Sequence, residues 1–600
     1  MRKLIRLVIV CCLLVSWVPL RAAYFSFVPR TLTQPNGEQL HCFASGDEFY
    51  NWLHDAEGYT IIQNTETGYF VYAAKENDKL IATPWIPGKD NPAAKSGLRP
   101  WLKISQEEYL QRRHAMLDPA KRPVTRNKGT NKGHLNNIVI FIRFADDTNF
   151  TNSFNSVYEM FNDTIEPYNS MYTYFKQASY NQLFIKSFFY PKPNGDLILS
   201  YQDSLTRDYY VPWSPTDTNG YMTDSARRSM EFGLLARSVE YVKDMIPADL
   251  NIDYDDDGYV DNVCFVIRGD VGDWNVLLWP HRWALYGQEA YIHGKRVWDF
   301  NFQLADAGYY FSNSTLCHEM FHTLGAPDLY HYSDSTNSDA VGQWDLMCSN
   351  AHPYPQQMLV YMKYKYGNWI SYEDIVELTE YGRYPLRANG SDTIDHLAYR
   401  VPTQNPFEFI LMEYRNKSMQ YDHTPQGGII FYRVNPLLDG NANYNGDDVL
   451  DEVYVFRRNN NTSNANFNQA HNHFNPNTNP YPCTSDGEVV NVSFGNISSY
   501  MLNNPPEFME FDYLHYVGLP ELEQSISVYP NPANQSITIN TDLVSEKTVQ
   551  VLDLSGRVVA EQKTADPQIN LNISRLSAGC YFIKVTDPDQ HSFTTKFIKQ

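Results

Sequence analysis

Two histidines four residues apart, His318 and His322, lie in a segment with the chemistry of a metal site, and Glu319 stands beside the first of them. In an α-helix, residues four apart lie about 40° apart around the axis, so both imidazoles would face one side with Glu319 at its edge. The apolar residues of the segment would take the opposite face, namely Leu316, Met320 and Leu324. Gly325 suits the left-handed residue that ends a helix. The spacing therefore predicts a short helix that presents two imidazoles to one point, rather than a helix with two unrelated histidines.

A catalytic zinc ion usually has three protein ligands and an open position for water, so the two histidines need a third partner. Asp328 follows soon after the helix, and a carboxylate oxygen is an acceptable zinc ligand. Asp334 and Asp345 are also within reach along the chain and stay open as alternatives. Glu319 would be the general base that takes a proton from the attacking water. We therefore predict a Zn²⁺ site held by both histidines and Asp328, with Glu319 as the catalytic residue.

The pattern HExxHxxGxxD (318–328) resembles the zinc motif of metzincin-type proteases. With "GAPDLY" completing it and "WDLM" around Met347, it is similar more specifically to the immune inhibitor A-like family of secreted bacterial metalloproteases. The resemblance runs from about Ile138 to about Tyr513. It implies an α/β zincin/metzincin-like catalytic domain that cleaves protein or peptide substrates and is made with a propeptide. It also implies that Met347 forms the floor beneath the metal.

Two further positions are candidates for the cleft. The stretch "LLWPHRWAL" (277–285) is similar to one that precedes the zinc helix in that family, which makes His281 or Arg282 a candidate to line the cleft. Tyr330, just after Asp328, is a candidate to support the oxyanion. The alternative for each is a purely structural role.

A second metal pattern lies in the acidic segment "NIDYDDDGYVDNV" (251–263). Its residues fit positions 1, 3, 5, 7 and 9 of a calcium loop: Asp253, Asp255, Asp257, Tyr259 through its carbonyl, and Asp261. Gly258 fits the turn at position 6, whereas Cys264 stands at position 12, where an EF-hand has a bidentate glutamate. We therefore exclude a complete EF-hand and predict a Ca²⁺-binding loop that serves stability. The alternative is a solvated acidic turn.

The length and charge of the chain limit what it can be. Its 600 residues imply several domains, because single cores stop growing near about 250–300 residues. Lys and Arg number 48 against 69 Asp and Glu, which gives a net charge of −21. A chain so acidic is unsuited to nucleic acid or to an anionic membrane surface, and we expect neither as a partner.

Residues 1–23 are typical of a signal peptide. Three basic residues precede an apolar run from Leu7 to Leu20, and two alanines follow as the cleavage site. The run is too short for a membrane anchor, which needs about 20 apolar residues. We therefore predict an exported protein with no transmembrane span after cleavage.

The C-terminal segment has short alternating stretches and frequent turn residues, which predict a small Ig-like β-sandwich. Four of its motifs resemble the C-terminal sorting domain recognised by the type IX secretion system: "VYPNPAN" (528–534), "DLSGR" (553–557), "LSAGCYFIKV" (576–585) and the terminal "KFIKQ". The resemblance implies the type IX secretion machinery as a partner and a destination across the outer membrane, extracellular or attached to the cell surface. An ordinary carbohydrate-binding or spacer module is the alternative.

Helix and strand periodicity predicts the elements that position the candidate metal sites. Apolar runs at 136–147 and 260–269 predict two buried strands, and helical spacing at 172–185 and 225–245 predicts helices between them. Segment 42–74 suggests a helix followed by hairpin strands.

Four segments follow the signal peptide: a propeptide with a basic linker (24–134), a zinc metalloprotease catalytic domain (135–384), a β-sandwich domain (385–517) and the sorting domain (524–600). The linker, 118–134, is basic within an acidic protein and suits cleavage after Lys or Arg, so we expect a latent proenzyme. An ordinary interdomain linker is the alternative. Cys42, Asp47 and Asp55 are open candidates to occupy the metal in the latent form.

Together these patterns predict a secreted zinc-dependent endopeptidase, in which zinc-activated water hydrolyses peptide bonds with a glutamate as general base. The alternative is a catalytically silent cell-surface binding or adhesion protein on a protease fold. Degenerate relatives commonly lose the base or a ligand, and here Glu319 and the ligand candidates are all in place.

Overall fold

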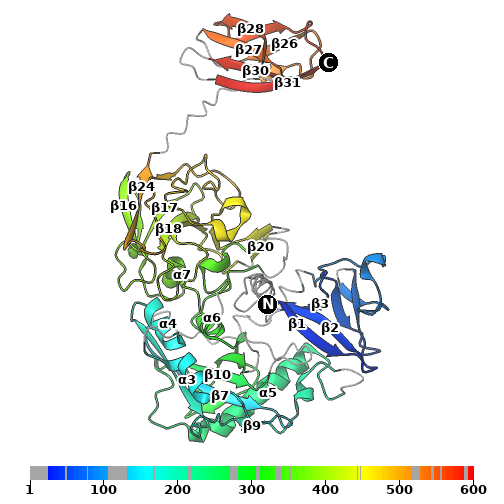
Figure 1. The fold of residues 1–600 in the computed structure, drawn as a ribbon, viewed down its shortest axis with the longest axis vertical. Coiled ribbons are helices and arrows are strands. Elements are labelled where there is room, and N and C mark those ends of the chain that lie inside the picture. The colour runs from blue at the N-terminus through cyan, green and yellow to red at the C-terminus, as the bar shows by residue number, and fades with distance from the viewer. Residues whose placement is uncertain are drawn as a thin grey trace, which may run out of the picture. The chain divides into compact units, whose positions relative to one another are not determined.

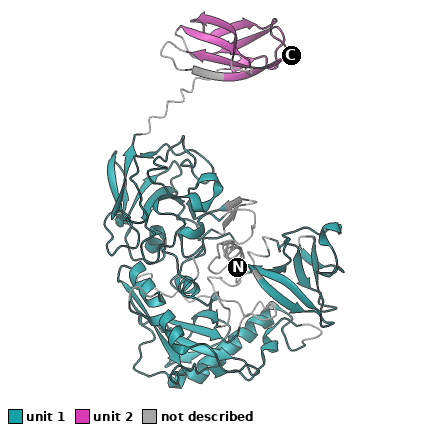
Figure 2. Ribbon diagram, in the orientation of Figure 1, with its two compact units in different colours: residues 1–515 teal, residues 516–600 magenta. Residues whose placement is uncertain are grey.

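The protein is seen in a computed structural model. It describes residues 25–46, 50–77, 79–105, 108, 131–165, 169–213, 218–269, 281–305, 311–331, 339–350, 353–441, 443–445, 448–515, 527–541, 546–553, 557–586 and 592–600. The chain is multidomain and mostly β-sheet, and it divides into two compact units, residues 1–515 and 516–600 (Figure 2).

The first unit begins with a six-stranded antiparallel sheet whose strands follow one another in sequence order (Figure 1). Its strands are β1 (Phe25–Thr33), β2 (Gln39–Gly46), β3 (Asn51–His54), β4 (Thr60–Gln63), β5 (Phe70–Glu76) and β6 (Lys79–Ala82). The helix expected at the start of 42–74 is wrong, because the described part of that stretch lies in β2 and β3. From Leu40 to Ala44 every second side chain is buried, which is the period of a strand.

A mixed sheet forms the centre of the first unit, in the order β11-β14-β10-β7-β8, with β9 also paired to β7. Its strands are β7 (Gly133–Arg143), β8 (Leu183–Tyr190), β9 (Tyr201–Gln202), β10 (Asn262–Ile267), β11 (His281–Ala284) and β14 (Asp299–Leu304). All of its pairings are parallel except that of β11, the edge strand, which runs antiparallel to β14. The hairpin β12 (Tyr291–Ile292) and β13 (Lys295–Arg296) lies between β11 and β14 in the chain.

Helices pack on both faces of this sheet (Figure 1). They are α3 (Phe154–Asn162), α4 (Met171–Ala178), α5 (Asp224–Val242) and α6 (Asn313–Thr323), and a further helix, α7 (Val360–Lys365), follows in the chain. In β7, Ile138, Ile140 and Ile142 share a core with α5, whereas Val139 and Phe141 share one with α3, α4 and α6. Because both faces of β7 are buried, the strand is an uninterrupted apolar run in the sequence.

The strands expected at 136–147 and 260–269 are confirmed as β7 and β10, and the helix expected at 225–245 is confirmed as α5. The helix expected at 172–185 is too long: α4 ends at Ala178, and the last residues of the segment begin β8.

Two further sheets pack face to face in the C-terminal part of the first unit. The larger contains β15 (Ile375–Glu377), β17 (Ala398–Pro402), β18 (Phe409–Arg415), β19 (Gly428–Val434) and β22 (Val453–Val455). The smaller contains β16 (Gly382–Arg387), β24 (Phe508–Leu514) and β23 (Ser493–Gly495), and a separate hairpin contains β20 (Asn443–Asn445) and β21 (Asp448–Leu450). Ile410, Met412 and Ile429 point to the core between the two sheets, whereas Leu411 and Ile430 point to the core that contains α6. One face of the larger sheet therefore packs into the same core as α6.

The second unit is a small β-sandwich, as expected. One sheet contains β25 (Ser527–Tyr529), β26 (Ser536–Asn540) and β29 (Gln568–Asn572), and the other contains β27 (Lys547–Leu552), β28 (Val558–Thr564), β30 (Gly579–Thr586) and β31 (Ser592–Lys599). Ile537 and Ile539 from the first sheet share one core with Val549, Ile583 and Phe597 from the second.

In the described part of the chain, no helix combines the length and the apolar character that crossing a membrane requires.

Candidate metal centre

Helix α6 carries the two histidines of the predicted zinc site. Its N-cap is Ser312, and Gly325 has a φ of +105°, the left-handed conformation expected at the helix end. His318 is fully buried and His322 is half-buried. The predicted helix is confirmed.

Three side chains converge at one point. The Nε2 atoms of His318 and His322 lie 3.0 Å apart, and the Oδ1 atom of Asp328 lies 3.1 Å from the first and 3.3 Å from the second. In a tetrahedral site with zinc–ligand bonds of about 2.0–2.1 Å, neighbouring ligand atoms are about 3.3 Å apart. The spacing of these three atoms therefore fits a zinc ion.

Hydrogen bonds fix the tautomer of each histidine. His318 Nδ1 lies 3.1 Å from the carbonyl oxygen of Leu346, and His322 Nδ1 lies 2.7 Å from that of Ala326. A carbonyl oxygen only accepts, so each Nδ1 donates and each neutral Nε2 keeps its lone pair. Two imidazole lone pairs and a carboxylate oxygen then face one another, and this arrangement of acceptors suits a cation at its centre.

Burial and the contacts between Asp328 and the two histidines shift the pKa values of Asp328 and His322 in opposite directions. Burial alone would raise the pKa of Asp328, but the adjacent His322 and His318 side chains outweigh it and hold that pKa below its usual range. Burial would lower the pKa of His322, and the charge of the Asp328 carboxylate reverses this shift. Asp328 is therefore ionised, as a metal ligand must be.

Glu319 lies on the same helix with its side chain 1% exposed. Burial raises the pKa of its carboxyl group, and the nearby His318 and His322 act in the opposite direction. Its Oε1 atom has no hydrogen-bond partner among the described residues. A buried carboxyl group beside a metal site, with one oxygen uncommitted, is suited to accept a proton from water.

Of the two alternative third ligands, Asp345 is described, and its carboxylate is committed to backbone groups. Asp345 uses its carboxylate to accept the backbone N–H groups of Met347 at 2.7 Å and Leu359 at 2.6 Å. Burial raises the pKa of Asp345 to about 7. Asp334 lies outside the described residues.

The turn that contains Met347 contacts the site through the backbone. Met347 is fully buried, and its carbonyl oxygen accepts the N–H of Leu329 at 2.8 Å. The preceding carbonyl, that of Leu346, is the acceptor for His318. The turn is thus joined to one histidine ligand and to the residue after Asp328.

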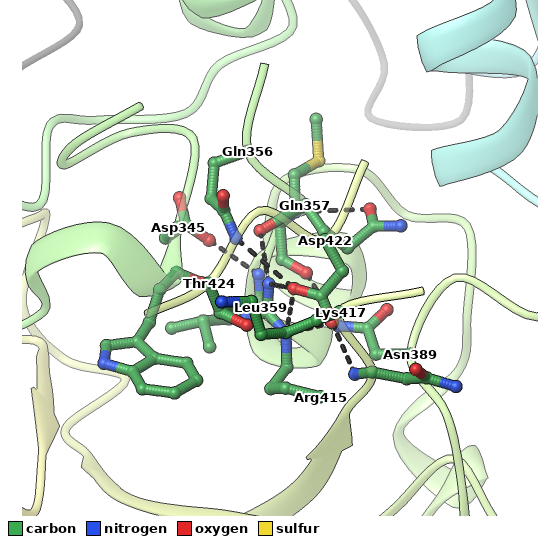
Figure 3. Close-up of polar contacts among 12 residues, drawn as sticks. Asp345, Gln356, Gln357, Leu359, Asn389, Arg415, Lys417, Asp422 and Thr424 are labelled. Atoms are coloured by element: carbon green, nitrogen blue, oxygen red, sulfur yellow. Dashed lines mark hydrogen bonds and ion pairs between the residues drawn. The ribbon is translucent and has the colours of Figure 1, made fainter. Parts of the chain in front are cut away.

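A fully buried charge network supports this turn from β18 (Figure 3). Arg415 donates to the carbonyl oxygen of Trp344 at 2.5 Å and pairs with Asp422 at 2.7 Å. Glu413, from the same strand, accepts the N–H of Val360 at the start of α7 at 2.8 Å. Two charges on β18 therefore fix both the turn before Met347 and the helix that follows it.

A ladder of buried asparagines connects the central sheet to α6, and sequence reasoning missed it. Asn262 on β10 donates to Asn137 Oδ1 at 2.8 Å and to Asn301 Oδ1 at 2.7 Å. Asn301 on β14 then donates to the Glu319 carbonyl oxygen at 2.9 Å and to Thr323 Oγ1 at 3.1 Å. The signal in the sequence was a single polar residue within or beside each apolar run, but the strand register was needed to bring these residues together.

Replacing Asn262 with alanine should lower the free energy of unfolding by about 1–3 kcal/mol, because it leaves the buried oxygens of Asn137 and Asn301 without donors. Urea denaturation measures the change. The matched control is Asn155→Ala on the exposed face of α3, which should change stability by about 0.5 kcal/mol or less. Equal effects for the two variants would contradict the role given to the ladder.

Two of the candidate cleft residues, Tyr330 and His281, are buried. Tyr330 is fully buried in the core that contains α6. His281, on β11, has its Nε2 2.9 Å from Glu231 of α5 and stacks on Phe302. Its charge is near enough to act on the pKa of Glu319, but these contacts are on the sheet face that carries α5.

The acidic loop brings together part of its predicted ligand set. Asp253, Asp255 and Asp257 place carboxylate oxygens within 4.8 Å of one another. Asp253 also pairs with Lys295 at 2.6 Å. Asp261 is not part of this group of three, and it accepts the backbone N–H groups of Tyr254 and Asn136, each at 3.1 Å. For Tyr259, the described hydrogen bond is donated by its N–H to Asp257.

Comparison with known proteins gives matches to short parts of the chain. An ulvan lyase of Nonlabens ulvanivorans is 40% identical over 75 residues, which are 12% of this chain and 14% of the lyase. An endo-acting ulvan lyase of Formosa agariphila is 30% identical over 78 residues, which are 13% of this chain and 15% of that lyase. This chain thus spans about one seventh of the length of the curated relatives it matches.

Among solved structures, a DUF3244 family protein from Bacteroides vulgatus with an immunoglobulin-like β-sandwich fold is 21% identical, over 12% of this chain and 84% of that chain, with a TM-score of 0.12. PorZ, a surface component of the type IX secretion system of Porphyromonas gingivalis, is 13% identical, over 38% of this chain and 40% of that chain, with a TM-score of 0.13.

The C-terminal unit gives the clearest match. Residues 527–600 match the family described as "Secretion system C-terminal sorting domain". This range contains all four motifs on which the sequence prediction rested. Residues 527–600 are therefore a type IX secretion C-terminal sorting domain, which directs the protein through the type IX machinery across the outer membrane to the cell surface or the extracellular space.

Proposed function

We propose that the chain is a secreted zinc-dependent endopeptidase, made as a latent proenzyme, with the α/β zincin/metzincin-like catalytic domain of the immune inhibitor A-like family. The observation that carries the proposal is the convergence of three acceptor atoms at 3.0–3.3 Å, from His318, His322 and Asp328, on the helix and loop that also hold the buried Glu319. The buried Met347, in a turn whose backbone contacts His318, supports the same family.

Each residue of the site has a separate role in the proposed peptide hydrolysis. Bound there, Zn²⁺ would lower the pKa of a coordinated water toward about 7 and polarise the scissile carbonyl group. His318 and His322 present Nε2 because each Nδ1 donates to a backbone carbonyl oxygen. Glu319 takes the proton that the attacking water loses and passes it to the leaving amine nitrogen. Its burial keeps this proton transfer away from bulk water.

Latency is proposed for residues 24–134, which contain the sheet β1–β6. Trp52 from β3 and Tyr50 just before that strand pack into the core that contains α6, which supports a propeptide docked on the enzyme. Cys42 is buried in the sheet's own core, and Asp55 accepts Tyr59 N–H at 2.8 Å and the Tyr72 hydroxyl at 2.9 Å. Neither supports a metal-blocking role. Asp47 lies outside the described residues.

The proposal is tested by metal content and protein cleavage together. The purified protein is assayed for zinc and for casein cleavage, before and after limited trypsin digestion that would cut the basic segment 118–134. We expect one zinc ion per chain and cleavage that appears after trypsin is applied and then inhibited. Addition of 1,10-phenanthroline should abolish cleavage, and excess Zn²⁺ should restore it.

The same assay separates the alternative function. A His318→Ala protein, digested in the same way, controls for residual trypsin and should bind no zinc at this site. Bound zinc without cleavage of any protein offered would support the catalytically silent surface binding or adhesion protein instead. A folded wild-type protein without zinc would contradict both the site and the activity.

We also propose that the acidic loop binds Ca²⁺ through Asp253, Asp255 and Asp257, with the ion displacing Lys295 from Asp253. Ca²⁺ at about 100 times its dissociation constant should stabilise the folded protein by about 2.7 kcal/mol, because it binds the folded loop. Thermal denaturation with and without Ca²⁺ measures this effect. Asp255→Asn should abolish the shift and the exposed Asp392→Asn should not, whereas equal shifts in both variants would contradict the site.

A further inference from the structure

A loop distant in the sequence holds the backbone of the candidate third ligand. Asn441, between β19 and β20, donates its N–H to the carbonyl oxygen of Asp328 at 3.1 Å and its side-chain Nδ2 to that of Leu329 at 3.1 Å. The same side chain is tied to β22, since it donates to Val453 O at 2.8 Å and accepts Val453 N–H at 3.0 Å. Asn441 is fully buried, so these hydrogen bonds are shielded from water.

The residue before it is a glycine for a steric reason. Gly440 has a φ of +77°, and a Cβ atom placed on it would lie 2.5 Å from the carbonyl oxygen of Asp328. A contact that short cannot exist without moving one of the two backbones. Only glycine therefore allows the loop to approach Asp328 this closely.

The buried carboxylate of Glu452 holds this loop in turn. Glu452, which is fully buried, accepts the N–H of Gly440 at 2.6 Å, the Tyr361 hydroxyl at 2.7 Å and the Tyr366 hydroxyl at 2.8 Å. Tyr361 belongs to α7, and Tyr366 follows directly after it. The loop that contacts Asp328 is therefore held in place through the hydrogen bonds of Glu452 to α7 and to the residue after it.

We infer that Asn441 and Gly440 are positioning residues for the metal centre: they set the backbone of Asp328 so that its Oδ1 atom meets both histidine Nε2 atoms. This inference rests on the proposed zinc site. The two histidines are oriented by the carbonyl oxygens of Leu346 and Ala326. Asn441 and Gly440 give the third ligand a corresponding support, from the part of the chain that follows the zinc helix by more than 100 residues.

The first test uses matched glycine variants of the full-length protein. Gly440→Ala should weaken zinc affinity by about 10- to 100-fold, the usual cost of losing a support of a metal ligand. Gly487→Ala is the control, because Gly487 has a similar φ of +86° but an added Cβ would meet nothing within 4 Å. Its zinc affinity should stay within about twofold of the wild type. Zinc affinity is measured by competition with a chromophoric chelator, independently of activity.

The second test is a double-mutant cycle. Asn441→Ala keeps the backbone N–H to Asp328 but removes the side-chain bonds to Leu329 and Val453 that hold it in place. It should weaken zinc affinity by about 10- to 100-fold in the wild-type background, but by about twofold or less in an Asp328→Ala background, since it acts through that ligand. A merely structural role would weaken affinity equally in both backgrounds. Asn466→Ala, another buried asparagine that donates to a backbone carbonyl, that of Gly427, is the control and should leave affinity unchanged.

The outcomes distinguish this inference from the proposed function. A wild type that binds zinc while Gly440→Ala and Asn441→Ala retain its affinity would overturn the positioning role and leave the zinc site intact. A wild type without zinc would overturn the site itself. Failure of both variants to fold, when Gly487→Ala and Asn466→Ala fold, would show that the loop supports the whole unit rather than Asp328, and would also overturn the inference.

Discussion

Replacing Glu319 with glutamine should lower kcat/KM for peptide cleavage by about 10²- to 10⁴-fold, the usual contribution of a general acid–base residue. Glutamine keeps the size of the side chain but cannot take up the proton of the attacking water. Zinc affinity should be unchanged, because the three converging atoms come from His318, His322 and Asp328. Steady-state cleavage of a fluorogenic peptide by the activated protein gives the rate, and metal analysis of the same sample gives the zinc content.

The control for this substitution is Glu380→Gln, which makes the same chemical change at an exposed position of the first unit. It should leave both cleavage and zinc content unaffected. Full activity in Glu319→Gln would assign the general base to another residue. Loss of zinc from this variant would instead show that Glu319 takes part in holding the metal.

Replacing Arg415 with methionine should lower the free energy of unfolding of the first unit by about 3–5 kcal/mol. The guanidinium group is fully buried between Asp422 and Glu413, and its removal leaves both carboxylates buried without their cation. Methionine keeps much of the apolar volume, so the loss is electrostatic. Urea denaturation followed by tryptophan fluorescence measures it.

Arg383→Met is the matched control for Arg415→Met. Arg383 also pairs with two carboxylates, those of Glu510 and Asp512, but its side chain is 46% exposed. Such a surface pair is worth about 0–1 kcal/mol. Similar losses for the two arginines would contradict the importance of burial in the network around the Met347 turn.

Local features of the site could be predicted from the sequence, because they depend on spacing along a helix. The two histidines and Glu319 share a face of α6 as a consequence of helical geometry alone, and Gly325 ends the helix with the expected positive φ. Asp328 could be proposed because only a short turn separates it from that helix. The strands β7 and β10 could be predicted since continuous apolar runs are typical of strands buried on both faces.

What supports the site could not be predicted, because it depends on contacts between distant residues. Asn441 reaches the residue after Asp328 across 112 positions of sequence, and Asn262 meets Asn137 across 125. Arg415 contacts the carbonyl oxygen of Trp344 across 71 positions. Each of these residues looks like an isolated polar residue within or near an apolar strand until the strand register is known.

The incorrect expectations have the same cause. The helix expected at the start of 42–74 is replaced by β2 and β3, because pairing with neighbouring strands outweighs local helical spacing in a short segment. The helix expected at 172–185 is shortened for the same reason, since its last residues begin β8 and pair with β7. The contacts of His281 with Phe302 and Glu231 also depend on strand register, that of β11 against β14.

Zinc K-edge X-ray absorption on the purified full-length protein tests the proposed metal centre most directly. We expect one zinc ion per chain, bound by two imidazole nitrogens at about 2.0–2.1 Å together with oxygen ligands. This signal should disappear in a His318→Ala/His322→Ala double variant that remains folded. A folded wild type without zinc, or a zinc ion that the double variant binds in the same environment, would contradict the assignment of His318, His322 and Asp328 as the metal centre.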